Sequence, residues 1–327
     1  MIAVTGANGL LGSYILRKLA EEQRAVIALK RKGSNYSHVS ELANITWREL
    51  EILDPLSVQE AFKDATSVIH TAAHVSFNPR KRKELMDVNV IGTKHIVDAC
   101  LAQGIQHLTH ISSIAALGRK KEVPILDESA RWVESDLNTD YAESKYKGEL
   151  EVWRAAEEGL AVSIINPSVI LAPADWTKSS AQLFRYVWKE NKFFSPGHLN
   201  YVDVRDVVEL IWNVHLNKIS GERFIANGGM ISIKELFDKI GTRFRKKSPS
   251  IKIPASIVAS FARLEELRGA MMGIEPLITR QSVKATRENF QYLNSKAVNQ
   301  LGHSFRNLEE TLDWCCSWYL RTYTTNK

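Results

Sequence analysis

The sequence predicts an α/β protein, built on a doubly wound parallel sheet and completed by a smaller C-terminal domain. Two observations carry this prediction. In the first half of the chain, short runs of apolar, β-branched residues alternate with segments of helical apolar spacing. After Pro173 this alternation breaks up, and tryptophan and phenylalanine become frequent. A chain of 327 residues is long enough for about two such domains.

Composition and charge narrow the class of protein. Hydrophobic residues make up 44% and charged residues 24% of the chain, as in ordinary globular proteins. No run approaches the length of a membrane span, and the chain enters a strand at Ile2 without the regions of a signal peptide. The three cysteines form no CxxC pair, so we expect a cytoplasmic protein with no metal site. The net charge of +6 is mild and mostly scattered, so nucleic acid binding is not expected.

The first predicted strand, residues 2–5, runs into a glycine-rich turn that is followed by a segment of helical apolar spacing. In such a strand–turn–helix unit, glycines let the backbone turn tightly and approach a pyrophosphate. The N–H groups at the start of the helix then favour its negative charge. We therefore predict a dinucleotide site formed by Gly6, Asn8, Gly9, Leu10, Leu11 and Gly12.

The end of the second predicted strand, residues 25–29, bears on the choice of cofactor. It runs into Lys30-Arg31-Lys32-Gly33, with no acidic residue to bind the ribose hydroxyl of NAD. A basic residue suits the 2′-phosphate of NADP instead. Arg31, with Lys30 or Lys32, thus favours NADP(H), and NAD(H) is the alternative. A solvated turn of basic residues is the structural alternative.

Two further strand ends are expected beside the cofactor. The third strand, about residues 45–52, ends at Asp54, which is predicted with equal weight to bind the adenine amino group or to cap the next helix. The fourth strand runs into Thr71, Ala72 and Ala73, which are small enough for a cofactor to lie close against the strand end.

A basic cluster and a long helix come next. Residues 78–83 read Asn-Pro-Arg-Lys-Arg-Lys, which predicts either a solvated loop or a docking point for a phosphorylated substrate. The helix expected over about residues 83–102 carries Asn89 and Gly92. A glycine inside a helix indicates a close approach to a neighbouring backbone.

Three Tyr/Lys pairs have the four-residue spacing that places both side chains on one face of a helix: Tyr14/Lys18, Tyr141/Lys145 and Tyr292/Lys296. Only Tyr141 follows a predicted strand, residues 107–111, that ends in serines. Ligands in such sheets bind beyond the carboxyl ends of the strands. We therefore predict that Ser113, Tyr141 and Lys145 are catalytic, with the ammonium lowering the pKa of the phenol.

The next predicted strand, residues 161–165, leads into Asn166-Pro167. Pro167 lacks an N–H donor and would suit a wall along a nicotinamide ring, and Val169 is added to the predicted cofactor contacts. We assign residues 1–173 to the dinucleotide-binding domain, to which 201–229 and 286–305 return. Residues 174–200 and 230–285 are expected to form a substrate-capping domain, with an amphipathic segment at 255–272, and 306–327 a C-terminal helix.

With these residues assembled, the chain resembles the extended short-chain dehydrogenase/reductase family over nearly its full length. The matching motifs are Thr5–Gly12, His70–Ala73, Asn89–Thr93, Ser113 with Gly118, Tyr141 with Lys145, Tyr201–Val207, Asn294–Ala297 and Leu301-Gly302. Residues 166–173 are more similar to the dihydroflavonol reductase, cinnamoyl-CoA reductase and 3β-hydroxysteroid dehydrogenase branch than to nucleotide-sugar epimerases. Ala172-Pro173 departs from the Gly-Pro that is usual there.

The resemblance implies a Rossmann fold and an NAD(P)-dependent oxidoreductase that reduces a carbonyl or oxidises the matching alcohol. Ser113 would hydrogen-bond the carbonyl, Tyr141 would donate the proton and Lys145 would hold the nicotinamide ribose. The helix motif adds Asn89 to the expected cofactor contacts. The alternatives are an NAD-dependent nucleotide-sugar epimerase or dehydratase and, less favoured, a cofactor-sensing regulator. A small-molecule substrate and a homodimer through the helices near 83–102 and 141–158 are also implied.

Overall fold

The structure is a computed structural model that describes residues 1–254, 281 and 289–324. Its main element is a seven-stranded parallel sheet with the order β11-β7-β5-β4-β1-β2-β3, which confirms the predicted doubly wound fold. Its strands are β1 (Ile2–Thr5), β2 (Val26–Lys30), β3 (Ile45–Glu49), β4 (Ser67–His70), β5 (His107–Ile111), β7 (Val162–Pro167) and β11 (Glu222–Ala226).

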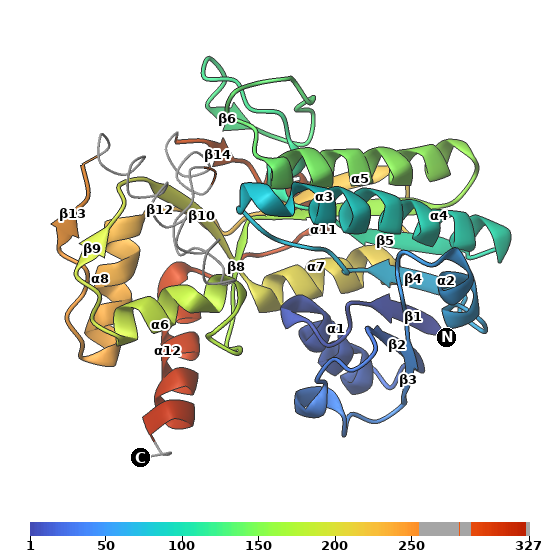
Figure 1. Cartoon of the computed structure of the whole chain (residues 1–327), viewed down its shortest axis with the longest axis horizontal. Helices are drawn as coiled ribbons and strands as arrows, with labels where there is room; N and C mark the ends of the chain where they lie inside the picture. The colour runs from blue at the N-terminus through green and yellow to red at the C-terminus, as the bar shows by residue number, and fades with distance from the viewer. Residues whose placement is uncertain (255–280, 282–288, 325–327) are drawn as a thin grey trace.

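Helices cover both faces of this sheet (Figure 1). Side chains alternate along a strand, so Ala3 packs in the core beneath α4 and α5, whereas Val4 packs in the core formed with α1 and α7. The helices of this part are α1 (Leu10–Glu21), α2 (Pro55–Ala61), α3 (Arg82–Met86), α4 (Thr93–Ala102), α5 (Asp140–Glu157) and α7 (Val204–Leu216). None of the described helices is long and apolar enough to span a bilayer.

The order of the strands fixes where a ligand can bind. From β1 the sheet grows in one direction through β2 and β3 and in the other through β4 and β5. The connections therefore diverge between β1 and β4, whose last residues, Thr5 and His70, lie side by side in register. In open sheets of this kind the crevice beyond the strand ends at such a reversal binds the ligand.

The helix expected over residues 83–102 is in fact three pieces, because a π-helical turn (Asp87–Gly92) separates α3 from α4. Close packing accompanies the irregularity. A Cβ on Gly92 would lie 2.9 Å from Cγ1 of Ile52, and a Cβ on Gly148 of α5 would lie 2.5 Å from the carbonyl oxygen of Asn89. The close approach predicted at Gly92 is thus confirmed, although its neighbour is a side chain. π-Turns are frequent at functional sites, and this one carries Asn89.

The smaller part of the molecule contains short sheets and the aromatic core (Figure 1). Strand β10 pairs with β8 and β12, whereas α7, β11 and α11 pack with or belong to the main sheet. The remaining described strands and helices are β6 (Ile125–Leu126), β8 (Val169–Leu171), β9 (Phe193–Phe194), β10 (His198–Asp203), β12 (Gly229–Ser232), β13 (Ile251–Lys252), β14 (Gln291–Tyr292), α6 (Gln182–Trp188), α8 (Ile233–Phe244), α11 (Ser295–Leu301) and α12 (Leu308–Thr324). The amphipathic segment at 255–272 lies outside the described residues.

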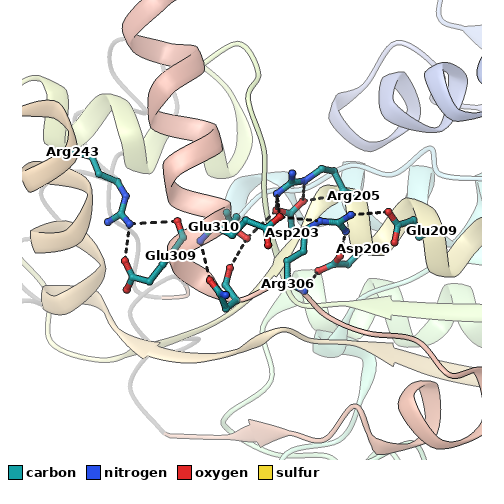
Figure 2. A network of polar contacts seen from close by, with 10 residues as sticks. Asp203, Arg205, Asp206, Glu209, Arg243, Arg306, Glu309 and Glu310 are labelled. Atoms are coloured by element: carbon teal, nitrogen blue, oxygen red, sulfur yellow. Dashed lines mark hydrogen bonds and ion pairs between the residues drawn. The ribbon is translucent and has the colours of Figure 1, made fainter.

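A network of charged side chains joins α12 and the residues just before it to the rest of the chain (Figure 2). Asp203, at the end of β10, accepts hydrogen bonds from the Arg205 guanidinium and from the Thr311 hydroxyl of α12. Asp206, at the start of α7, accepts from both the backbone and the guanidinium of Arg306. Both carboxylates are buried, so each depends on partners from the last helical segment.

We expect Asp206→Ala to lower the free energy of unfolding by about 2 kcal/mol, because it leaves the Arg306 backbone N–H without its acceptor and leaves the guanidinium only its more exposed partners, Glu209 and Glu310. Denaturant titration measures this. The matched control is Glu309→Ala in the same network (Figure 2). Its carboxylate is 53% exposed, so its loss should cost no more than about 1 kcal/mol. Equal losses of unfolding free energy in Asp206→Ala and Glu309→Ala would contradict the conclusion that burial decides how much each carboxylate stabilises the fold.

Candidate active site

The glycine loop between β1 and α1 has the backbone geometry that a bound pyrophosphate needs. Gly6 has φ +64°, a conformation that favours glycine, and a Cβ there would lie 2.9 Å from the backbone of Ala72. A Cβ on Gly12 would lie 2.2 Å from the Gly6 carbonyl oxygen, so the loop closes directly against α1. Gly9 is exposed and begins α1 without a side-chain cap. The N–H groups at the start of α1, including those of Leu10 and Leu11, are therefore not capped by a side chain and suit a dinucleotide.

The β4 end is tied to the β1 end beside this loop. The Thr71 hydroxyl donates to the carbonyl of Thr5 at 2.6 Å, and the Ala72 N–H donates to the Thr5 hydroxyl at 3.1 Å. Asn8 donates to the carbonyl of Asn35 at 2.9 Å, which fixes the outer side of the loop. Thr71, Ala72 and Ala73 are at least partly exposed at this mouth, as their predicted cofactor contacts require.

The basic residues at the end of β2 divide into two kinds. Lys30 lies 3.8 Å from Glu49 and over the Tyr36 ring, so its charge is already used within the protein. Arg31 and Lys32 are exposed, and in the described part of the chain no hydrogen bond or ion pair occupies either side chain. The end of β2 therefore presents free cationic groups beside the crevice.

Two predicted cofactor contacts have structural roles. Asp54 accepts a hydrogen bond from the Leu56 N–H and caps α2, so the capping alternative is observed and the adenine contact stays a prediction. Asn89 is buried and accepts from the His74 N–H, while its amide hydrogens go to the His74 carbonyl and the Ser144 hydroxyl. These hydrogen bonds use the Asn89 amide to join the β4 loop to α5. Its predicted contact with the cofactor stays a prediction.

Ser113 and Tyr141 meet beyond the end of β5. The Ser113 hydroxyl accepts a hydrogen bond from the Ala115 N–H at 3.1 Å, which starts a short 3-10 helix, and it lies close enough to the Tyr141 hydroxyl to lower its pKa. Tyr141 lies in the first turn of α5, whose Thr139 cap accepts from the Ala142 N–H. The cap and the strand end thus hold the two hydroxyls together.

Lys145 lies one helical turn after Tyr141 and is buried. Its ammonium donates to the carbonyl oxygen of Ile111 at 2.9 Å, at the end of β5. Burial lowers the pKa of Lys145 to about 8, against the opposing effect of Glu149. The structure therefore brings together all three predicted catalytic side chains at the mouth that adjoins the glycine loop.

The structure does not show the predicted lowering of the Tyr141 pKa by Lys145. Burial is the largest influence on the phenol and raises its pKa, and the Ser113 hydrogen bond opposes this rise. Lys145 is directed at a backbone carbonyl rather than at the phenol. The tyrosine is thus held protonated in this arrangement, and the serine, not the lysine, is its hydrogen-bonding neighbour.

Sequence reasoning missed four residues around this triad. Phe77 lies edge-on to the Tyr141 ring, with 5.9 Å between ring centroids. Glu149, Asn166 and Arg223 form a buried hydrogen-bonded chain behind the triad. The sequence does contain a signal for Glu149, because this residue follows Lys145 by four residues on the same helix. Arg223 had none, since only the tertiary fold brings β11 to α5.

The end of β7 forms the remaining predicted wall. Pro167 is the last residue of β7 and is buried, and Val169 is partly exposed in β8. Both side chains are apolar. Their predicted contacts with a nicotinamide ring stay predictions. The other two Tyr/Lys pairs are used elsewhere: Tyr14 donates to the carbonyl of Pro173, and Tyr292 accepts from Arg119.

The basic cluster at residues 79–83 is mostly neutralised. Arg82 pairs with Asp140 and with Glu143 at 2.8 Å, Lys81 with Glu84 at 2.6 Å and Lys83 with Asp87 at 2.5 Å. These pairs favour the alternative of a solvated loop over a phosphate-docking point. Within the described ranges, no group of three or more potential ligands is placed to hold a metal ion.

Residues 2–226 match the model of the NAD dependent epimerase/dehydratase family. The chain belongs to this family. The matched range contains the glycine loop, Ser113, Tyr141 and Lys145. The protein is therefore an NAD(P)-dependent enzyme of a family whose members include reductases, dehydrogenases and epimerases.

Named relatives are similar over most of the chain. A Synechocystis protein whose name proposes dihydroflavonol 4-reductase activity is 29% identical over 322 residues, which cover 97% of this chain and 93% of that protein. Cinnamoyl-CoA reductase 1 of Petunia hybrida is 28% identical over 225 residues, with coverages of 63% and 66%. These names agree with the reductase branch that the motifs resemble.

Solved structures agree on the fold. The crystal structure of gox2253 has a TM-score of 0.84 at 27% identity and covers 99% of this chain and 98% of its own. UDP-glucose 4-epimerase of Thermotoga maritima has a TM-score of 0.81 at 20% identity, with coverages of 98% and 99%. The second likeness concerns the fold alone.

Proposed function

We propose that this protein is an NADP(H)-dependent oxidoreductase that reduces an aldehyde or ketone, or oxidises the matching alcohol, through Ser113, Tyr141 and Lys145. The observation that carries the proposal is that Ser113 and Tyr141 come together beyond the end of β5, one helical turn from a buried lysine. A carbonyl oxygen is an acceptor that both hydroxyls can serve at once.

When bound, the nicotinamide supplies or accepts the hydride. The protein's own residues position the carbonyl compound and protonate its oxygen. Ser113 donates a hydrogen bond to the carbonyl oxygen, and Tyr141, kept protonated by burial, transfers its proton to that oxygen. Lys145 presents an ammonium whose remaining hydrogens can bind the hydroxyls of the nicotinamide ribose.

The substrate class can be found by screening aldehydes, ketols, steroids and nucleotide sugars against the protein with NADPH. A substrate that is reduced consumes NADPH, which its absorbance reports, and a ligand that only binds raises Tm by mass action. Reduction of a simple carbonyl compound supports the proposal. Interconversion of a nucleotide sugar without net use of cofactor would support the epimerase alternative instead.

The neutralised basic cluster weighs against that alternative. In an epimerase, the docking point predicted at residues 78–83 would have to bind a nucleotide diphosphate. Arg82 and Lys83 face carboxylates there, so a diphosphate would have to displace existing ion pairs. The intact Ser113, Tyr141 and Lys145 weigh against a regulator that binds the cofactor without turnover.

Arg31→Ala should weaken NADPH binding by about 10- to 100-fold, since a hydrogen bond to a charged group contributes about 1.5–3 kcal/mol. NADH affinity should change little, because NADH has no 2′-phosphate. Fluorescence titration of both cofactors measures this. Arg24→Ala is the control, because Arg24 precedes β2 at its opposite end. A wild-type preference for NADH would contradict the assignment of Arg31.

A homodimer remains part of the proposal. The helices expected to form it, α4 and α5, lie together on one face of the sheet (Figure 1). This layer exposes two large aliphatic side chains, Ile91 at 43% and Leu150 at 47%. Light scattering should give the mass of a dimer, and Leu150→Asp should reduce it to that of a monomer.

A further inference from the structure

Glu149 is a buried carboxylate that neither the proposed reaction nor the glycine loop uses. It lies on α5 four residues after Lys145, hence on the same face of the helix, and its side chain is fully buried. One carboxylate oxygen accepts a hydrogen bond from the Asn166 amide at 2.6 Å, and the other accepts from the Arg223 guanidinium. A buried carboxylate is costly unless it is paired in this way.

The chain of hydrogen bonds continues to the catalytic serine. The same Asn166 amide donates to the carbonyl oxygen of Ser113 at 2.9 Å. The carbonyl oxygen of Ile111, two residues before Ser113, accepts a hydrogen bond from the Lys145 ammonium at 2.9 Å. The end of β5 is therefore held at two carbonyls, by Lys145 and by an amide that Glu149 fixes.

Glu149 is also the negatively charged group that acts on the pKa of Lys145. From β4 and β5 the lysine is faced by His70 and His110, and burial holds the pKa of both well below the usual value, so both are neutral. From its own helix Glu149 raises the pKa of Lys145 and opposes burial. Arg223, on β11, is paired with Glu149 itself.

We propose that Glu149 is a positioning residue of the active site, which places Ser113 through Asn166 and keeps Lys145 charged. This inference rests on the proposed function for its effect on turnover. Its effect on the charge of Lys145 concerns cofactor binding and does not depend on which substrate is reduced. Arg223 acts as the anchor that holds the carboxylate in place.

The test uses Glu149→Gln in the full-length protein. We expect kcat/KM to fall by about 10- to 100-fold, because small displacements of a reacting group have effects of this size. We also expect NADPH affinity, titrated by fluorescence across pH, to be lost on the alkaline side at a lower pH than in the wild type. A residue that only stabilises the fold would not move this pH dependence.

Two further variants separate position from charge. Glu149→Asp keeps the charge but shortens the reach to Asn166, so kcat/KM should fall while the pH dependence of NADPH binding stays near that of the wild type. Glu151→Gln is the control, because Glu151 lies on the same helix and pairs outward with Arg154 at 3.0 Å. It should behave as the wild type in both measurements.

The outcomes distinguish this inference from the proposed function. A folded Glu149→Gln protein with wild-type kcat/KM and unchanged pH dependence would overturn the role of Glu149, even if Tyr141→Phe is inactive. A wild type that reduces no carbonyl would overturn the proposed function, while the pH dependence of NADPH affinity still tests Glu149. If Glu149→Gln does not fold, Asn166→Ala removes the same link to Ser113, and wild-type turnover in that variant overturns the inference.

Discussion

Turnover should fall by about 10²- to 10⁴-fold in the Tyr141→Phe variant, the usual contribution of a positioned general acid. The variant loses the hydroxyl that lies beside Ser113 and keeps the ring that packs against Phe77. NADPH should therefore still bind with an affinity near that of the wild type. Steady-state kinetics and a fluorescence titration measure the two quantities separately.

Tyr146→Phe is the matched control. Tyr146 lies on the same helix, and its ring is stacked on Trp132 with 4.5 Å between ring centroids. Removing its hydroxyl should leave turnover unchanged. Wild-type turnover in Tyr141→Phe would mean that another group donates the proton.

Gly12→Ala should abolish measurable binding of NADPH. The added Cβ would lie 2.2 Å from the carbonyl oxygen of Gly6 and 2.9 Å from Cα of Ala7. Both neighbours are backbone atoms, so the loop itself must move away from α1, and the N–H groups that would bind the pyrophosphate move with it. Cofactor titration and circular dichroism together show whether binding is lost while the protein stays folded.

Gly104→Ala provides the comparison. Gly104 has φ +67° and open space around it, so an alanine there costs only the strain of the backbone, about 1–2 kcal/mol. It lies at the end of α4, before β5. We expect a lower Tm and normal NADPH affinity. Equal loss of NADPH binding in both variants would contradict a specific role for the glycine loop.

Local patterns predicted the main sheet well. Several of its strands are short runs rich in apolar residues, followed by signals such as the glycines after Thr5 or the Asp54-Pro55 start of α2. The polar-edged strands are less evident, and β11, which reads Glu-Arg-Phe-Ile-Ala, was not predicted. The third strand is shorter than expected and ends at Glu49. The pairing of β10 with β8 and β12 was missed, since register between distant strands depends on tertiary contacts that no local pattern records.

Sequence patterns predicted which side chains of the candidate site come together better than they predicted its electrostatics. The spacing of Tyr141 and Lys145 and the serines after β5 pointed to three side chains that the structure places together, and their catalytic roles stay predictions. The direction of the lysine could not be read from spacing, because the carbonyl of Ile111 competes for its ammonium. The role of Asn89 was likewise hidden, since its partners His74 and Ser144 come from separate segments.

The network around Asp203 and Asp206 has a consequence for synthesis on the ribosome. Asp203 and Asp206 are translated about a hundred residues before Arg306 and Thr311, which donate hydrogen bonds to them. Until those residues leave the exit tunnel, burial of the two aspartates lacks its compensating donors. The first strands of the main sheet can form as the chain emerges, but α7, which packs against that sheet, buries Asp206 with its partner only after Arg306 has emerged. A nonsense codon before Arg306 would therefore leave α7 without the donor that its buried carboxylate needs.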